Sequence, residues 1–231
     1  MTDEAQGAVV AIDRSRRIVS PPNLNQMAAS YVRQEIFSGM LKPGQKIDQD
    51  GVATLLGVSK LPVREALISL EHEGIVENIP RRGSFVAALT RVDILDHYQL
   101  IALASGLAAR RAVEYLRPED FDRLSAILDE LEKTASPDRQ DELNAAFHRS
   151  INLAGGSLRL RSALRLLTQT MPEHFYEFAV GWNENAKDEH RLVLAALRVR
   201  NGEAAEKAMV EHITSGGQYA VRRLDEVGFW S

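Results

Sequence analysis

Three histidines in the second half of the chain have the residue types and the spacing of a metal site. His148 follows Asn144 by four residues, about one turn of a predicted helix, and His190 and His212 lie on two later predicted helices. The apolar residues that share their helical faces are Ala186, Leu194 and Leu197 for His190, and Ala205, Ala208 and Met209 for His212. A single histidine on such a face usually packs in a core, whereas three indicate imidazoles that converge on one cavity. Three nitrogens and one amide oxygen suit zinc, nickel or iron(II) better than magnesium or calcium.

A second set of side chains has the pattern of a nucleic-acid contact. Lys60 and Arg64 are four residues apart on a predicted helix, so both project from one face. An arginine can bind guanine O6 and N7 with two hydrogen bonds, whereas a lysine offers one mobile charge. Arg81 and Arg82 lie at the tip of a predicted hairpin, where they could reach phosphate or the minor groove. The alternative is solvated surface charge, with Arg64 paired to a neighbouring acid.

Short elements between residues 23 and 88 must position these cations. Helices are predicted over 26–38, from Asp48 to Gly57 and from Ser59 onward, followed by strands over 75–79 and 84–88. Gly83 takes the left-handed position in the hairpin loop. Two helices that are joined by a short turn and followed by a hairpin make a winged helix-turn-helix, whose second helix enters the DNA major groove. That second helix is capped by Ser59.

From Arg91 onward every segment has the pattern of a helix, and six helices are expected in an antiparallel bundle. Their expected bounds are set by caps, prolines and glycines: Thr90 with Asp93, Pro118, Ser136-Pro137 to Gly155-Gly156, Ser157 to about Gly181, about Glu184 to Asn201, and Gly202 to about Glu226. Cofactor and ligand sites are built inside such bundles, so this arrangement can bring the three histidines together. The predicted fold class is therefore mainly α, with a small β-hairpin wing.

Composition limits the classes of protein that remain. The 231 residues include no cysteine, which excludes a disulfide scaffold, a thiolate metal site and a thiol nucleophile. The net charge of −4 arises after residue 88, and it does not decide DNA binding, which depends on a local basic face. Residues 1–22 are polar and basic in part, and we interpret them as a mobile tail. No apolar run approaches the roughly 18 residues of a membrane span, so we expect a cytoplasmic protein without a membrane partner.

The predicted helix-turn-helix contains several motifs that belong together. They are Ser59-Lys60-Leu61-Pro62-Val63-Arg64-Glu65-Ala66-Leu67, Leu70-Glu71-x-x-Gly74-Ile75-Val76, Arg81-Arg82-Gly83-Ser84-Phe85-Val86, and upstream Gly39-x-Leu41-x-Pro43-Gly44. These segments resemble the GntR family of bacterial repressors. The resemblance implies a homodimer on a palindromic operator in double-stranded DNA, bound through Ser59, Lys60, Arg64, Arg81, Arg82 and Gly83. The family usually has Arg-Thr at Lys60-Leu61, and some members have a DNA-contacting arginine at Asp50, so the operator sequence does not transfer.

The histidines lie in motifs of their own. These are Asn144-Ala145-Ala146-Phe147-His148, Glu189-His190-Arg191 and Glu211-His212-Ile213. They resemble the FCD ligand-binding domain of FadR-type GntR members, in which a D-x-x-[FL]-H motif and two later histidines bind a metal in many cases. Asn144 replaces the usual aspartate, and this neutral ligand leaves the ion's full charge. The change implies weaker metal affinity but a preference for an anionic effector, such as a carboxylate.

The resemblance also points to an effector pocket. Many relatives carry Arg and Glu in the first bundle helix, where this chain has Ile101 and Ser105. This difference implies a more apolar pocket with a different ligand. His174 is a further candidate to line it, with core packing as the alternative.

Together these features predict a ligand-responsive DNA-binding transcriptional regulator, expected to be a repressor. Residues 23–88 would bind DNA, while residues 89–231 would bind the effector at or near the metal, form the dimer and alter operator binding. One alternative is a metal-dependent enzyme that uses the histidine cluster. Against it, Glu189 and Glu211 each precede a ligand and are expected to point elsewhere, so no general base can be named. Another alternative is a metal sensor, in which the ion itself is the effector.

Overall fold

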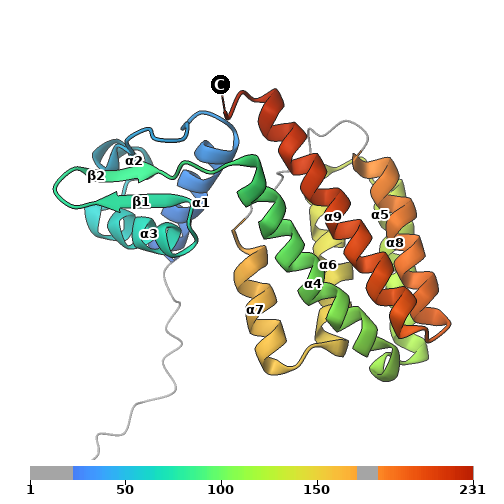
Figure 1. Ribbon diagram of the computed structural model, residues 1–231. Helices are drawn as coiled ribbons and strands as arrows, with labels where there is room; N and C mark the ends of the chain where they lie inside the picture. Colours follow the sequence, from blue (N-terminus) through green and yellow to red (C-terminus); the bar gives the residue numbers. More distant parts are fainter. Residues whose placement is uncertain (1–22, 171–181, 231) are drawn as a thin grey trace, which may run out of the picture.

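The computed structural model describes residues 23–170 and 182–230 of the chain. Its elements are α1 (Leu24–Phe37), α2 (Gln49–Leu56), α3 (Lys60–His72), β1 (Val76–Ile79), β2 (Gly83–Val86), α4 (Arg91–Tyr115), α5 (Pro118–Lys133), α6 (Pro137–Gly155), α7 (Leu158–Thr168), α8 (Trp182–Arg198) and α9 (Gly202–Glu226). Figure 1 shows α1–α3 and the two strands in one lobe and α4–α9 in a second, all-helical lobe. The predicted fold class, a winged helix-turn-helix followed by a helical domain, is confirmed.

Local signals define the helix-turn-helix. The Asp48 side chain accepts hydrogen bonds from the backbone N–H groups of Asp50 and Gly51, and Gly57 ends α2 in the left-handed region at φ 65°. The buried face of α3, which includes Val63 and Leu70, packs mainly against α1. One expectation needs correction, because Ser59 occupies the N-cap position of α3 but its hydroxyl makes no capping hydrogen bond. Ser59 is exposed, so water can serve the N-terminal N–H groups of α3 instead.

The wing is a two-stranded antiparallel hairpin in which Val76 pairs with Val86. Gly83 adopts the predicted positive φ, at 108°. Arg81 also has a positive φ, 64°, which is uncommon for a residue with a Cβ atom and reflects the tight turn at the wing tip. The hairpin therefore presents two consecutive exposed arginines, Arg81 and Arg82, on its loop.

The helical lobe is built around α4. The Thr90–Asp93 capping box starts this 25-residue helix as predicted, and α4 packs against α6, α7 and α9. Glycine allows the closest approach, because a Cβ on Gly155 would lie 1.8 Å from the backbone oxygen of Ala108 in α4. No helix within the described part of the chain is long and apolar enough to cross a bilayer.

Two helices end earlier than the sequence pattern predicts. α7 ends at Thr168, whereas we expected a helix to about Gly181, of which residues 171–181 lie outside the described part of the chain. The hydroxyls of Thr168 and Thr170 bond to carbonyl oxygens of the last turn, which competes with helix continuation. α8 ends at Arg198 rather than Asn201, because Arg200 has a positive φ of 57° and the Asn201 side chain caps α9.

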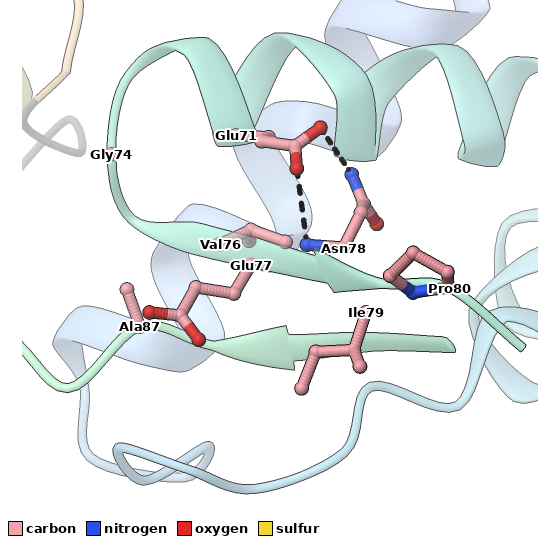
Figure 2. A pocket seen from close by; sticks show the side chains of 8 residues that line it. All are labelled: Glu71, Gly74, Val76, Glu77, Asn78, Ile79, Pro80 and Ala87. Atoms are coloured by element: carbon pink, nitrogen blue, oxygen red, sulfur yellow. Dashed lines mark hydrogen bonds between the residues drawn. The ribbon is translucent and has the colours of Figure 1, made fainter. Parts of the chain in front are cut away.

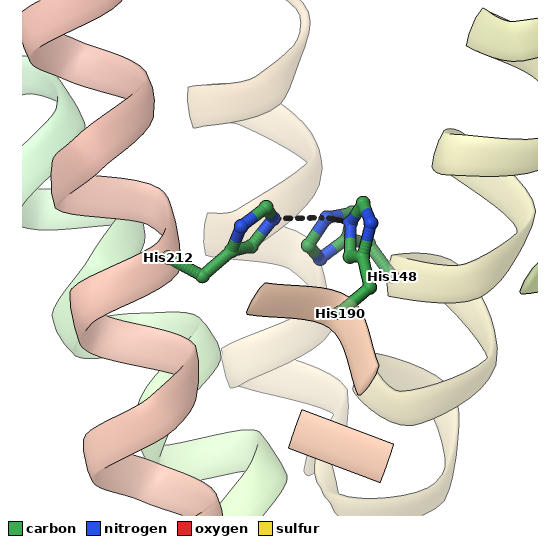
Figure 3. Close-up of side chains that lie close together, drawn as sticks. All are labelled: His148, His190 and His212. Atoms are coloured by element: carbon green, nitrogen blue, oxygen red, sulfur yellow. Dashed lines mark hydrogen bonds between the residues drawn. The ribbon is translucent and has the colours of Figure 1, made fainter. Parts of the chain in front are cut away.

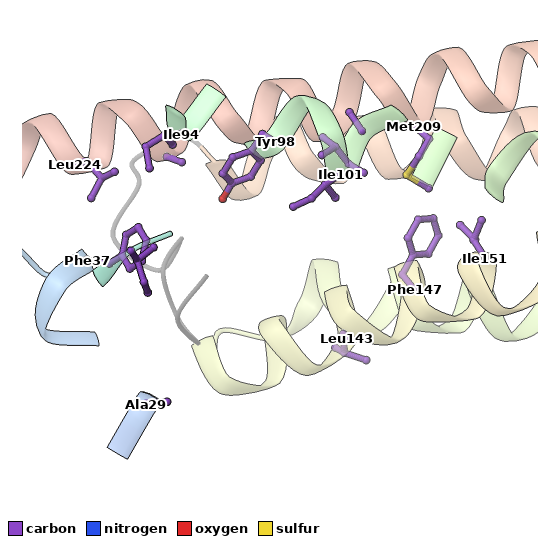
Figure 4. Close-up of a cluster of buried hydrophobic side chains, with 14 of the residues drawn as sticks. Ala29, Phe37, Ile94, Tyr98, Ile101, Leu143, Phe147, Ile151, Met209 and Leu224 are labelled. Atoms are coloured by element: carbon purple, nitrogen blue, oxygen red, sulfur yellow. The ribbon is translucent and has the colours of Figure 1, made fainter. Parts of the chain in front are cut away.

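The two lobes share a hydrophobic contact. After α9, residues 227–230, which we call the C-terminal segment, return to the first lobe, where Phe229 is buried and stacks on Phe37 of α1 with ring centroids 6.4 Å apart. The Trp230 indole donates a hydrogen bond to the Leu89 carbonyl at 2.7 Å, and Lys42 donates one to the Gly228 carbonyl at 2.9 Å. Figure 4 shows Phe37 beside Leu224 and Ile94 at this junction. One buried cluster therefore extends from the DNA-binding lobe into the bundle.

Candidate metal centre and nucleic-acid interface

Three helices bring the candidate histidines together. α6 supplies His148, α8 supplies His190 and α9 supplies His212, and Figure 3 shows their imidazoles meeting between the helices. Nε2 of His148 lies 3.3 Å from Nε2 of His190 and 3.2 Å from Nε2 of His212. His190 and His212 are 1% and 2% exposed. The structure therefore places one ligand-capable nitrogen from each helix within 4.8 Å of the other two, inside the bundle.

Hydrogen bonds alone cannot account for both of these nitrogen–nitrogen contacts. Nε2 of His148 takes part in both contacts, yet a nitrogen of a neutral imidazole either donates one hydrogen or accepts with one lone pair. It can therefore satisfy only one neighbour with a well-formed hydrogen bond. A separation of about 3.3 Å is also the edge of a tetrahedron with metal–nitrogen bonds of about 2.0–2.1 Å. A shared cation would resolve the conflict, because all three Nε2 lone pairs could then face it.

The side chain of Asn144 provides an unused oxygen on the same helical face. Asn144 precedes His148 by one turn of α6, and its Oδ1 is buried without a hydrogen-bond partner. Leaving a buried acceptor unpaired costs about 1–3 kcal/mol, so such an atom calls for a partner. Nδ1 of His190 is also buried and unpaired. The donor set of three nitrogens and one amide oxygen fits a zinc-, nickel- or iron-type ion.

Burial keeps the cluster in the protonation state that binds metal. Burial, together with the nearby His212, lowers the pKa of His148 to about 3. The same two causes, with His148 as a further neighbour, lower the pKa of His190 well below its ordinary value. Because a ligating imidazole must be neutral, both residues are ready to bind a cation at neutral pH.

Glu189 lies differently from what the sequence suggested. We expected its carboxylate to point elsewhere, but Oε2 of Glu189 lies 2.9 Å from Nδ1 of His212. The reason is geometric, since α8 packs alongside α9 and consecutive residues of a helix are about 100° apart, so His190 faces the cluster while Glu189 faces α9. Glu211 does project outward, with a side chain that is 65% exposed. Sequence spacing held no signal for this contact, which joins residues of two different helices.

An aromatic side chain packs against the cluster. Phe147 is fully buried and contacts the rings of His148 and His190 edge-on, with centroids 5.6 and 4.9 Å apart. Ile101 and Ser105 both lie on the buried face of α4, and Figure 4 shows Ile101 on the side of α4 that faces α6. His174, the remaining candidate for the effector pocket, lies outside the described residues.

The predicted DNA-contacting side chains of Ser59, Lys60, Arg64, Arg81 and Arg82 are all exposed on the first lobe. Arg64, on the outer face of α3, is exposed and has no ion pair with another described residue, which argues against the alternative that it is neutralised by a neighbouring acid. Lys60 does pair with Asp50 at 2.8 Å, with both side chains largely exposed. At the wing tip Arg81 is exposed, and the Arg82 guanidinium lies 5.5 Å from the ring centroid of Phe85.

An open pocket of about 460 Å³ lies where α3 meets the wing. Figure 2 shows that Glu71 of α3 accepts hydrogen bonds from the backbone N–H of Asn78, at 3.2 Å, and from its side-chain amide, at 2.8 Å. These bonds lower the pKa of Glu71, so it stays ionised. The second carboxylate of the pocket belongs to Glu77. Two acids make this pocket unsuitable for phosphate, and the two Glu71–Asn78 hydrogen bonds connect the wing to α3.

Comparisons with known proteins agree with both lobes. The profile described as "Bacterial regulatory proteins, gntR family" matches residues 24–86, and the profile of the FCD domain matches residues 96–215. The chain is 28% identical over 181 residues to an HTH-type transcriptional regulator of Mycobacterium tuberculosis, covering 78% of this chain and 74% of that protein. It is 25% identical over 195 residues to the HTH-type transcriptional repressor RspR of Escherichia coli, covering 82% and 86% respectively. Among solved structures, E. coli McbR/YncC has the same fold, with a TM-score of 0.65 at 21% identity over 86% of this chain and 97% of that one.

Proposed function

Because this chain belongs to the GntR family of bacterial regulatory proteins and carries an FCD domain, we propose that it is a ligand-responsive transcriptional repressor. A small anionic metabolite would bind at or near a metal ion in the helical lobe and alter operator binding. The relatives are transcriptional regulators and not enzymes, so a hydrolytic or oxidative role for the histidine cluster is set aside. The observation that carries the proposal is the pairing of an exposed cationic helix edge with a largely buried three-histidine cluster in one chain.

DNA binding is assigned to the N-terminal end of α3 and to the wing. In a winged helix-turn-helix the second helix enters the major groove with its first turns at the base edges. Arg64 would then bind bases, supported by Ser59 and Lys60, while Arg81, Arg82 and the backbone at Gly83 would contact phosphate or the minor groove. The exposure of Arg64, without an ion pair among the described residues, supports this assignment.

The metal is assigned to His148, His190 and His212, with Asn144 as a fourth ligand through its side-chain oxygen. The support is the Nε2 separations of 3.2 and 3.3 Å and the unpaired Oδ1 of Asn144. A bound divalent ion would attract the carboxylate of an effector, since all four protein ligands are neutral. Ile101 and Ser105, which carry no charge, would line the effector pocket.

A homodimer would place two winged domains on a palindromic operator in the cytoplasm. Its support is the exposed apolar surface of the helical lobe, where Val92, Leu100 and Leu103 of α4 and Leu158 and Leu166 of α7 are each more than half exposed. Exposed apolar patches of this kind mark interaction surfaces. A shift in the equilibrium between two arrangements of the dimer is the way in which an effector would change operator affinity.

The test is operator affinity measured on the metal-free protein, with zinc, and with zinc plus a series of small carboxylates. We expect zinc alone to change affinity little and one carboxylate to change it at least tenfold. If zinc alone produces the full change, the ion is the effector and the protein is a metal sensor. Operator binding that responds to neither addition would contradict the proposed ligand response.

A further inference from the structure

We infer that Glu189 is a positioning residue for the metal site, which fixes His212 and supplies the negative charge that Asn144 does not. This inference rests on the metal site assigned above and concerns a residue outside its ligand set. It starts from one contact, the 2.9 Å separation between Oε2 of Glu189 and Nδ1 of His212.

The contact decides which nitrogen of His212 carries the hydrogen. A carboxylate can only accept, so Nδ1 of His212 must donate, and the neutral ring then has its lone pair on Nε2. Nε2 is the atom that faces His148, at 3.2 Å. The His212 side chain is 2% exposed and that of Glu189 26%, so water competes little for this hydrogen bond. Glu189 therefore holds His212 in the tautomer that can bind a cation at the cluster.

The same carboxylate also changes the charge of the site. His148, His190, His212 and Asn144 are neutral donors, so they leave the two positive charges of a divalent ion uncompensated. Glu189 places one negative charge on the far side of the His212 ring, where a hydrogen-bonded carboxylate orients the imidazole ligand and strengthens its bond to a cation. This chain thus has its acidic group behind a histidine ligand on α8 rather than at position 144 on α6.

The chain contains a matched control. Glu189 and Glu211 each come directly before a histidine of the cluster, but only Glu189 contacts another ligand. The Glu211 side chain is 65% exposed and lies 3.8 Å from Lys207 on the surface of α9. Neutralising either residue changes the charge of the protein equally, so the difference between the two variants isolates the contact with His212.

The experiment measures zinc affinity of the full-length protein by competition with a chromophoric chelator. Glu189→Gln should weaken zinc binding about 10-fold, and Glu189→Ala more, within the roughly 10–100-fold range of outer-shell substitutions. Glu211→Gln should bind zinc as the wild type does. Asn144→Asp should restore affinity to the Glu189→Gln protein, because it returns one negative charge from a different helix. In ¹⁵N NMR spectra of the metal-free protein, His212 should carry its hydrogen on Nδ1 in the wild type and lose that preference in Glu189→Ala.

The possible results separate this inference from the proposed function. Wild-type protein without stoichiometric zinc would overturn the metal site itself. Zinc binding that depends on the three histidines but is equal in Glu189→Gln, Glu189→Ala and Glu211→Gln would overturn the role of Glu189 alone. Circular dichroism melting of each variant shows whether it is folded. Should Glu189→Ala be unfolded, the Glu189→Gln protein and its rescue by Asn144→Asp still decide the question.

Discussion

Two candidate sites are built in opposite ways. One is the exposed edge formed by α3 and the wing, and the other is the histidine cluster of the bundle. The first is exposed, carries four cationic side chains and is assembled from residues no more than 23 positions apart, from Ser59 to Arg82. The second is largely buried and neutral, and its outermost ligands, Asn144 and His212, are 68 positions apart. An exposed cationic site therefore needs only a correct local fold, whereas a buried ligand site needs all the helices that supply its ligands to pack in the correct positions.

The largest effect should follow from removing one histidine of the cluster. His148→Ala should lower zinc affinity by more than about 100-fold, because a lost ligand costs more than a lost outer-shell partner. Operator binding by the metal-free protein should stay within about twofold, since the substitution lies in the other lobe. Elemental analysis and a DNA mobility assay measure the two properties. His72→Ala, an exposed histidine on α3, is the control for adventitious zinc binding, and equal zinc loss in both variants would contradict the assignment.

Acid should destabilise the helical lobe before it affects the exposed edge. The pKa of His148 in the folded protein is about 3, whereas an unfolded histidine binds a proton below about 6.5. The unfolded state therefore binds more protons between these values, so the free energy of unfolding is highest above about pH 6.5 and falls toward pH 3. For each such histidine, the free energy of unfolding changes by up to about 1.4 kcal/mol per pH unit in this range.

Urea unfolding of the metal-free protein between pH 7 and pH 5 measures this slope, in a window above the titration of most carboxylates. His148→Gln, which cannot take up a proton there, should show a smaller slope. An identical slope in the two proteins would show that burial of His148 is not its origin.

Arg64 provides the corresponding test of the exposed edge. Arg64→Ala should weaken binding to the operator by about 1–3 kcal/mol and relax its base preference, whereas Arg81→Ala or Arg82→Ala should weaken binding to all sequences and reduce the salt slope by about 1. Titrations of operator and random duplexes at several salt concentrations distinguish these outcomes. A folded Arg64→Ala protein with unchanged operator affinity would assign recognition to other residues.

The smallest effect concerns the ion pair between Lys60 and Asp50. Both side chains are exposed, so breaking the pair with Asp50→Asn should cost less than about 1 kcal/mol of stability. The substitution frees Lys60 and removes a negative charge beside the recognition helix, so DNA affinity should rise a few-fold at low salt and less at high salt. Lower affinity instead would mean that Asp50 orients Lys60 toward DNA.

Sequence patterns predicted the parts of the molecule that are set by neighbours in the chain. Asp48, Gly57 and the Thr90–Asp93 pair define helix ends through bonds within a few residues, and all three behave as predicted. The early end of α7 was not predicted, because side-chain hydroxyls of Thr168 and Thr170 compete for its last carbonyls.

The candidate metal site was only partly predictable. Apolar helical faces indicated that His148, His190 and His212 point inward, and the structure does bring them together. Glu189 could not be placed from the sequence, since its contact with His212 depends on the rotation of α8 against α9. The pairing of Lys60 with Asp50 was missed for the same reason, because it joins two helices across a turn.

The C-terminal segment has a consequence for exchanging modules between regulators of this type. Phe229 completes the core around Phe37, and the Trp230 indole donates a hydrogen bond to the Leu89 carbonyl. The DNA-binding lobe is therefore formed by two segments that are far apart in the sequence. A chimera made by transplanting residues 23–88 alone would leave an apolar gap beside α1 and would join the recipient's own tail to a foreign surface. A transplant that also includes residues 227–230 keeps both halves of this contact.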